Sequence, residues 1–250
     1  MNLKKKSRLS KIFFDEDHYS HSIIRIPCPH CGELCSTLAK SCPKCGEPLN
    51  PTLKRVNKEK LDELIAFKSS ELQIIGKLEK IINTSILKVE KLERNIIGYI
   101  SDSENITGIS LFNCGLATIP EELMNLTNLK ILYLRRNFIN SLQKSIGFLS
   151  ALEEMDLSIN EISILPKSIG LLKSLRKLNL SSNKLLNIPD TIGTISNLEV
   201  LNLSNNRLKN VPISLNKLAA LKELNLKANF WITIHDSIIQ QKERGLRIDI

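Results

Sequence analysis

LRKLNLSSNKL, residues 175–185, is the stretch that decides the fold. Leucine stands at its first, fourth, sixth and eleventh places, and Asn183 stands at its ninth. The same phrase begins at six positions that lie 23 residues apart: Ile106, Leu129, Leu152, Leu175, Leu198 and Leu221. A strict period of this length predicts one supersecondary unit stacked on copies of itself, which is a solenoid.

Each unit has a strand half and a helical half. The fourth and sixth places of the phrase, such as Leu178 and Leu180, alternate with polar residues, so they point inward from a short strand. The ninth place holds Asn in every unit but the first, where Cys114 replaces it as a small buried residue. The second half carries proline and then apolar residues at spacings of three, which predicts a short helix or 3₁₀ segment on the convex side.

The chain resembles the 23-residue intracellular type of leucine-rich repeat, whose second half has the form L-P-x-x-I-G-x-L. Gly147, Gly170 and Gly193 stand at the expected glycine place, and the resemblance covers roughly residues 106–243. It implies an α/β solenoid, a horseshoe of about six repeats with a parallel sheet on its concave face. In that family the concave face is the usual site for protein partners.

The strand residues that alternate with the inward leucines should form that concave face. Aromatic residues and arginine, which often carry binding energy, gather at its N-terminal end. An alternative is that Phe112 and Tyr133 pack under an N-terminal cap, and that the neighbouring charges form solvated ion pairs. The predicted partner-binding residues are Phe112, Tyr133, Arg135, Arg136, Glu154, Asp156, Lys177, Asn179, Asn202 and Asn225.

Upstream of the repeats lies a cysteine module. Two C-x-x-C pairs, Cys28 with Cys31 and Cys42 with Cys45, are separated by ten residues, a spacing typical of a zinc site. Four thiolates would close the coordination shell of Zn²⁺, so the metal would be structural, and the glycine after each pair would supply the turn. Cys35 is surplus; it is interpreted as a buried or free thiol, and the alternative is that it competes as a ligand, since Cys31-x-x-x-Cys35 is also a plausible spacing.

The segment CPHCGELCSTLAKSCPKCGEPL resembles short zinc ribbons, although Ser41 stands where many of them have an aromatic residue. Two disulfides are the alternative, and they would need an oxidising compartment. The apolar run Ile12–Phe14 is too short for a signal peptide, and no stretch reaches the roughly 18 apolar residues of a membrane span. A cytoplasmic zinc protein is the consistent expectation.

Four segments follow from these patterns: a basic tail at 1–24, the zinc ribbon at 25–50, a helical linker or cap at 53–95, and the repeat domain at 96–250. Apolar residues at helical spacing predict one long helix between Asn57 and Ile96, or two that break near Ser69 or Asn83. It could cap the solenoid, space it from the ribbon, or pair in a coiled coil. Residues 96–100 and 106–111 should form a hairpin that covers the sheet edge.

The function predicted from these features is a protein-interaction scaffold, expected to be a monomer. The net charge of +9 is spread along the chain, and its densest run is the N-terminal Lys4–Lys11. A basic tail beside a zinc ribbon allows an alternative, a nucleic-acid-associated protein that makes contact through both. The sequence contains no glycine-rich phosphate loop and no H-E-x-x-H motif, so an enzyme is not expected.

Overall fold

The structure is a computed structural model, and it describes residues 25–27, 34–36, 41, 43–46, 71–102, 105–230 and 232–250. Contacts within the chain divide it into two compact units, Met1–Ala66 and Phe67–Ile250. The second unit contains all of the repeats.

The described residues of the first unit include one short hairpin. Strand β1 (Arg25–Pro27) pairs antiparallel with β2 (Leu34–Ser36), and Ile26 lies opposite Cys35. Residues 43–45 form a turn, and Gly46 follows with a φ of 75°, in the left-handed region that glycine adopts readily. Of the four predicted zinc ligands, Cys45 is half-buried, whereas Cys28, Cys31 and Cys42 lie outside the described residues.

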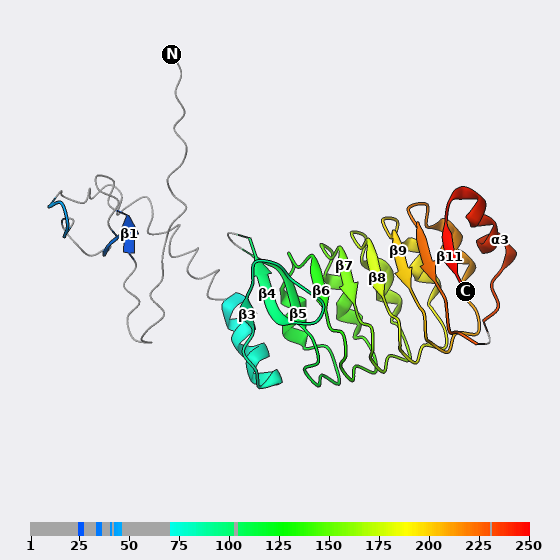
Figure 1. Ribbon diagram of the computed structural model, residues 1–250, viewed down its shortest axis with the longest axis horizontal. Helices are drawn as coiled ribbons and strands as arrows, with labels where there is room; N and C mark the ends of the chain where they lie inside the picture. The colour runs from blue at the N-terminus through cyan, green and yellow to red at the C-terminus, as the bar shows by residue number, and fades with distance from the viewer. Residues whose placement is uncertain are drawn as a thin grey trace, which may run out of the picture. The chain divides into compact units, whose positions relative to one another are not determined.

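The second unit is built on one sheet of nine strands in the order β11-β10-β9-β8-β7-β6-β5-β4-β3 (Figure 1). From β5 to β11 every neighbouring pair is parallel, and the register between repeats is one whole period, so that Leu178 lies opposite both Met155 and Leu201. The prediction of stacked repeats with a parallel sheet is confirmed. The repeat strands are β5 (Ile106–Leu111), β6 (Ile131–Tyr133), β7 (Glu154–Asp156), β8 (Lys177–Asn179), β9 (Val200–Asn202) and β10 (Glu223–Asn225).

Short 3₁₀ helices form the opposite side of the repeats, as the spacing of their apolar residues indicates. Four of the five follow a proline, and Gln143 takes that position before the second. A Cβ on Gly193 would lie 2.3 Å from the carbonyl oxygen of Ser214 in the next helix. Glycine is therefore what lets consecutive helices approach so closely. The helices are η1 (Glu121–Asn125), η2 (Lys144–Phe148), η3 (Lys167–Leu171), η4 (Asp190–Thr194) and η5 (Ile213–Lys217).

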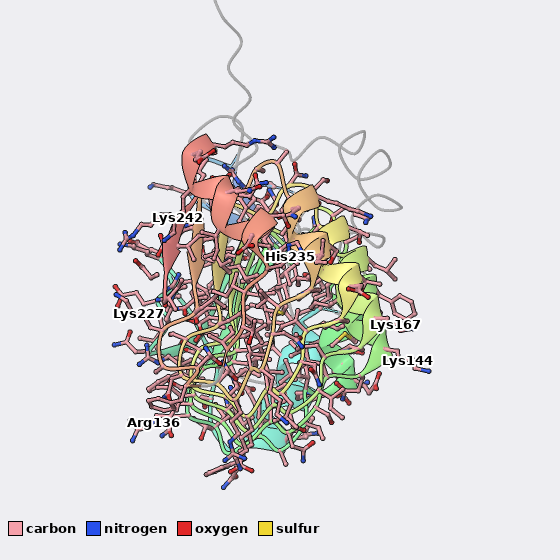
Figure 2. The ribbon with its side chains drawn as sticks, turned by 90° about the vertical axis from the view of Figure 1, so that its right-hand side faces the viewer. Arg136, Lys144, Lys167, Lys227, His235 and Lys242 are labelled. Atoms are coloured by element: carbon pink, nitrogen blue, oxygen red, sulfur yellow. The ribbon has the colours of Figure 1, made fainter. Side chains whose placement is uncertain are left out.

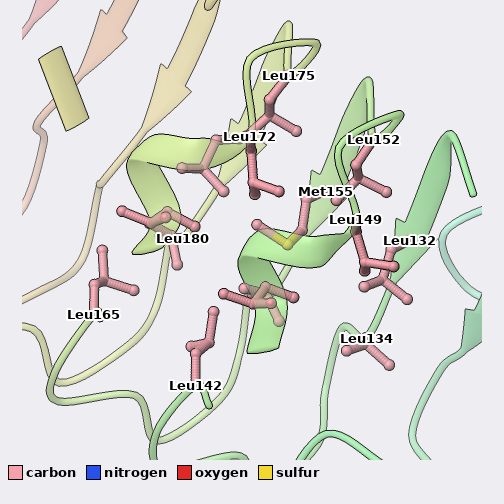
Figure 3. Close-up of a cluster of buried hydrophobic side chains, with 14 of the residues drawn as sticks. Leu132, Leu134, Leu142, Leu149, Leu152, Met155, Leu165, Leu172, Leu175 and Leu180 are labelled. Atoms are coloured by element: carbon pink, nitrogen blue, oxygen red, sulfur yellow. The ribbon is translucent and has the colours of Figure 1, made fainter. Parts of the chain in front are cut away.

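The core lies between the sheet and the 3₁₀ helices. The apolar residues at the first, fourth and sixth places of the repeat are buried throughout, and those from neighbouring units interdigitate (Figure 3). Leu152 and Leu175 are fully buried, and so are Leu149 and Leu172 from the helical half. One continuous apolar cluster thus runs along the second unit, which is the arrangement that a solenoid needs because a single repeat cannot bury its own core.

Buried asparagines bond each repeat to the one before it. The Nδ2 of Asn183 donates to the carbonyl oxygens of Leu157 and Leu180, both at 3.0 Å, and its Oδ1 accepts the N–H of Ile162 at 2.9 Å. Asn160 and Asn206 make the same set of bonds one period away. The inward Asn column predicted from the sequence therefore satisfies backbone groups of the buried turns.

A helix covers the N-terminal end of this core. Residues 71–82 are helical, and Ile74, Ile75 and Leu78 join the same apolar cluster as the repeats. The carboxylate of Glu71 accepts the N–H of Ile106 at the start of β5, and burial raises the pKa of this carboxyl. The buried face of this segment thus packs against the apolar cluster of the repeats.

The predicted helix does not continue to Ile96, because Asn83 has a φ of 52°, a left-handed conformation that ends helices. Strand β3 (Leu87–Lys88) follows instead and pairs with β4 (Ile97–Ser101). Strands β4 and β5 are antiparallel, and they lie where the sequence indicates a hairpin. At the other end, α3 (Asp236–Ile239), η6 (Gln240–Arg244) and β11 (Arg247–Asp249) follow the last repeat.

The eighth place of every repeat has a left-handed backbone, with φ between 53° and 59°. Five of the six residues there are Asn, Arg, Ser or Ala, but the third repeat has Ile159, whose φ is 56° and which is 40 % exposed. A β-branched side chain in this conformation is strained against its own backbone, by about 1–2 kcal/mol. The strain lies just beyond the C-terminal end of β7, one residue before the buried Asn160.

We expect Ile159→Asn to raise the free energy of unfolding by about 1 kcal/mol, because Asn tolerates the left-handed region. The reciprocal change, Asn205→Ile at the same place two repeats later, should lower it by a similar amount. Urea denaturation of the two variants beside the parent chain measures both effects. Equal effects of the same sign would contradict the strain argument.

Candidate functional site

The outward-facing strand residues of the second unit form one continuous surface, here called the concave face. It comprises the third, fifth, seventh and eighth places of each repeat. On β8 the pattern is clear, since Leu178 is buried while Lys177 is exposed and Asn179 is half-buried. Arg136 and Lys227 project from the sheet side of the unit, and Lys144 and Lys167 project from the side of the 3₁₀ helices (Figure 2).

The ten predicted partner-binding residues do not share one environment. Lys177 and Arg136 are exposed, and Asp156 and Tyr133 are buried, with 1 % and 6 % of their surface accessible. The others are half-buried: Phe112, Arg135, Glu154, Asn179, Asn202 and Asn225. The two buried residues lie on β6 and β7, in the N-terminal part of the face, whereas the predicted residues from Lys177 onward are half-buried or exposed and are here called its open part.

Arg94 covers the N-terminal part. It belongs to the segment between β3 and β4, and its guanidinium lies 5.6 Å from the centre of the Tyr133 ring. Its Nη2 donates to Glu154 Oε1 at 2.5 Å, and its Nε lies 3.5 Å from Asp156 Oδ2. Ring, guanidinium and two carboxylates thus form one cluster, in which the cation contacts both anions and a π face.

Other residues of the sheet hold the two carboxylates in place. Asp156 Oδ1 accepts the N–H and the hydroxyl of Ser158, at 2.9 and 2.6 Å, and Oδ2 accepts from Asn179 Nδ2 at 3.2 Å. The hydroxyl of Tyr133 donates to Glu154 Oε1 at 3.0 Å, and Lys177 Nζ lies 3.6 Å from Glu154 Oε2. Both anions are positioned by neighbours besides Arg94.

The cluster shifts the pKa values of its members. Burial acts to raise the pKa of Glu154, but the hydrogen bonds from Arg94 and Tyr133 and the charge of Lys177 outweigh it, and the pKa lies below its usual value. For Arg94, burial acts to lower the pKa, and the bonds to Glu154 and Tyr133 together with nearby carboxylates raise it overall. Burial and the charge of Glu154 raise the pKa of Tyr133. At neutral pH the arginine and Glu154 are therefore both charged.

The structure thus changes the interpretation of two residues. The repeat pattern predicts that Tyr133 and Asp156 contact a partner; within the described chain both are buried and contact Arg94, and Asp156 also bonds to Ser158 and Asn179. The packing of Tyr133 beneath an N-terminal segment matches the alternative in which it lies under a cap. Arg94 itself is missed from the sequence because it lies outside the 23-residue period, and only the acidic places at 154 and 156 signal a cationic neighbour.

The open part of the concave face lies over β8, β9 and β10. Asn202 Oδ1 accepts the N–H and the hydroxyl of Ser204, at 3.0 and 2.8 Å, and Asn225 Oδ1 accepts the N–H of Lys227 at 3.1 Å. These bonds fix which amide atom points back toward the strand. The Nδ2 groups of both residues are therefore left as donors on the face, in a row with Val200 and Lys177 beside them.

A row of ion pairs runs along the rim of the sheet, at the second place of the repeat. Glu199 accepts from Arg176 Nε and from Lys222 Nζ, both at 2.7 Å, and hydrogen bonds from Lys222 and Arg176 lower its pKa. These are solvent-accessible pairs, which contribute little to stability. Among the described residues there is no group of three potential metal ligands and no helix long and apolar enough to cross a membrane.

Comparisons with known proteins identify the family of the repeats. A family model described as "Leucine-rich repeat region" matches residues 109–242, more than half of the chain. Solved structures that match include a leucine-rich repeat protein of Leptospira interrogans, at 29 % identity over 54 % of this chain and 40 % of that one, with a TM-score of 0.44. No curated protein sequence matches significantly.

Two further solved structures are similar over about half of the chain. One is the functional domain of InlJ from Listeria monocytogenes, at 23 % identity, covering 51 % of this chain and 26 % of that one, with a TM-score of 0.43. The other is the plant peptide hormone receptor RGFR1 in complex with RGF2, at 27 % identity, covering 47 % and 22 %, with a TM-score of 0.41. The chain spans less than half the length of each of these three proteins.

The Arg94 cluster predicts a pH-dependent contribution to stability. Because the pKa of Glu154 is lowered in the folded state, its pairing stabilises the fold above the ordinary value of 4.5 and is lost as pH falls through the lowered value. Arg94→Gln should therefore cost about 1 kcal/mol at pH 7, after discounting for solvent screening, and progressively less below pH 4.5.

Urea denaturation between pH 3 and pH 7 measures this difference, and Arg176→Gln is the matched control, because it removes an arginine that pairs with one half-buried rim carboxylate, Glu199, to which Lys222 also bonds. We expect a smaller effect from the control at every pH. A cost for Arg94→Gln that stays constant down to pH 3 would show that the arginine acts by packing alone.

Proposed function

This chain belongs to the leucine-rich repeat family, and from that premise we propose that it is a protein-interaction scaffold whose concave face binds a protein partner. The observation that carries the proposal is the open row over β8–β10. There, half-buried amides and the exposed Lys177 stand on a rigid parallel sheet, at the spacing of about 4.8 Å that separates neighbouring strands.

The chemistry of this row suits a protein surface. Asn202 and Asn225 present amide donors whose orientation is fixed, so that little side-chain entropy is lost on binding. Val200 adds an apolar contact, and Lys177 and Lys227 add positive charge on either side. A partner with backbone carbonyls and acidic side chains would satisfy these groups.

The first unit supports a second proposal, a structural zinc site formed by Cys28, Cys31, Cys42 and Cys45. The hairpin β1–β2 brackets the first C-x-x-C pair between Pro27 and Leu34, and the second pair ends in a turn with Gly46 in the left-handed region. Four thiolates are the donor set that Zn²⁺ prefers in closed sites. Bound zinc would supply folding free energy to the ribbon, residues 25–50, which is too small to bury a core of its own.

A nucleic-acid-associated protein is the alternative, with contact through the ribbon and the basic run Lys4–Lys11. Only composition favours it, since the cysteine module carries Lys40 and Lys44 but no aromatic residue on which a base could stack. The protein-binding proposal rests in addition on an ordered surface, and we therefore favour it.

The zinc proposal predicts about one equivalent of zinc per chain, measured by elemental analysis of protein purified under reducing conditions. Cys28→Ser and Cys42→Ser should each lose the metal, while the circular dichroism and unfolding of the repeats stay unchanged. Cys114→Ser is the control, because Cys114 lies within the repeats, and it should keep the metal. Zinc-free protein with cysteines oxidised in pairs would overturn the site.

The concave face is tested with two matched substitutions of apolar residues. Val200→Arg places a long charged side chain on the open row, and Ile213→Arg places the same side chain at the start of η5, on the opposite side of the core. A partner captured by the full chain, and identified by mass spectrometry after cross-linking, should bind Val200→Arg about tenfold or more weakly, which corresponds to about 1.4 kcal/mol.

Ile213→Arg should bind that partner like the parent chain. Equal binding to all three proteins would place the contact elsewhere. Loss with Ile213→Arg alone would move it to the side of the 3₁₀ helices.

A further inference from the structure

The Arg94 cluster has two unlike sides, as a binding site and its ligand do: buried or mostly buried residues of the sheet, and one exposed side chain that contacts them. Tyr133 and Asp156 are buried in consecutive strands of the sheet, and Glu154 has a side chain that is 18 % exposed. The side chain of Arg94 is 46 % exposed, and its chain neighbours Glu93 and Asn95 are exposed as well. A rigid surface therefore receives one side chain from a solvent-exposed loop.

The surface has the chemistry that recognises a guanidinium. Glu154 and Asp156 contact two different nitrogens of Arg94, Nη2 and Nε. The central carbon of the guanidinium, Cζ, lies 5.6 Å from the centroid of the Tyr133 ring. A guanidinium can hydrogen-bond to two carboxylates and stack on an aromatic ring at the same time, because it is planar and its N–H donors point in several directions. The ammonium group of lysine is a compact point charge and cannot reach the three groups in the same way.

The surface also stands without Arg94. Ser158 and Asn179 fix both oxygens of Asp156, and Tyr133 and Lys177 hold Glu154. If the loop moved away, two carboxylates would remain in place with Lys177 as the nearest cation. Removing Arg94 therefore leaves an ordered anionic site beside the open row of the concave face.

We propose that Tyr133, Glu154 and Asp156 form an arginine-binding subsite of the concave face, which Arg94 occupies until an arginine of the partner replaces it. This inference rests on the proposed function, and it adds the chemistry of the partner: a protein segment that presents an arginine next to the groups bound over β8–β10. Arg94 competes as an intramolecular ligand, at the millimolar effective concentrations typical of short tethers.

Because Arg94 competes for the subsite, its removal should change the affinity of that subsite for an external arginine in a defined direction. A site that is mostly filled from within binds an external ligand more weakly, by the fraction of time that it is free. Arg94→Ala should therefore tighten the binding of an arginine side chain, whereas loss of a purely structural residue would leave that binding unchanged or weaken it.

The test uses the full chain and two small probes, N-acetyl-L-arginine amide and N-acetyl-L-lysine amide. Binding is followed by NMR titration of the backbone amides of Tyr133, Glu154 and Asp156. The Arg94→Ala variant should bind the arginine probe with a dissociation constant on the order of 1 mM, about tenfold tighter than the parent chain. The lysine probe should bind this variant several-fold more weakly.

Two controls isolate the subsite. Arg176→Ala removes an arginine paired with Glu199 on the rim, where no aromatic ring and only one carboxylate are in contact among the described residues, and it should gain no binding. Adding Asp156→Asn to Arg94→Ala should abolish the gain while keeping the hydrogen bond to Ser158. Arg94→Gln provides a second vacant site if Arg94→Ala unfolds.

The proposal is overturned if Arg94→Ala gains no affinity for the arginine probe, or if it binds both probes alike, which would indicate charge attraction alone. That failure differs from failure of the proposed function. A partner whose binding is lost with Val200→Arg and unchanged with Arg94→Ala would preserve the scaffold and remove only the subsite.

Discussion

The hydrogen bonds of the buried asparagines are the constraint on which the rest of the second unit depends. Each side chain bonds to carbonyl groups of its own repeat and of the repeat before it, as Asn183 does to Leu180 and Leu157. An insertion of one residue would break several buried bonds at once, and each unsatisfied group costs about 1–3 kcal/mol. The period is therefore held at 23 residues. Because the period is constant, side chains at the same place of successive repeats stack in straight columns. The concave face is therefore a row of equivalent positions.

The first repeat shows what happens where that constraint ends. Cys114 takes the Asn place, and its neighbour on the N-terminal side is the antiparallel strand β4 instead of another repeat turn. Asn137 accepts the N–H groups of Cys114 and Leu116, so the backbone of this turn is still satisfied from the following repeat. Burial raises the pKa of the Cys114 thiol to about 11, so it remains protonated and behaves as a small apolar group. The substitution fits an end position, where there are no earlier turn carbonyls for an amide to bind.

Periodic features could be predicted from the sequence, and non-periodic ones could not. The strands, the 3₁₀ helices, the Asn column and the outward places all follow from the repeat, because each recurs five or six times in one chain. The end of the N-terminal helix at Asn83 is only one of two breaks that the sequence allows, and β3 has no local signal, since both depend on contacts made once. Arg94 is missed for the same reason: its partners Glu154 and Asp156 lie 60 and 62 residues away, and no local pattern connects them.

The zinc ligands lie outside the described residues, apart from Cys45, and stay a prediction.

The way in which the N-terminal end of the solenoid is closed also determines what the concave face can bind. An open end would expose leucines and unpaired strand groups, so the chain adds a helix, a hairpin and the loop between β3 and β4. That loop brings Arg94 over β6 and β7. An aromatic or acidic side chain of a partner would there face an arginine that already contacts Tyr133, Glu154 and Asp156. Over β8–β10 no comparable cation–carboxylate cluster forms among the described residues. The fifth place changes from Asp156 to Asn179, Asn202 and Asn225, and the third changes from Glu154 to Lys177, Val200 and, on β10, Glu223. The change from carboxylate to amide at the fifth place therefore separates a part of the face with its own internal ligand from a part over β8–β10 that presents amides and lysines and is open to a partner.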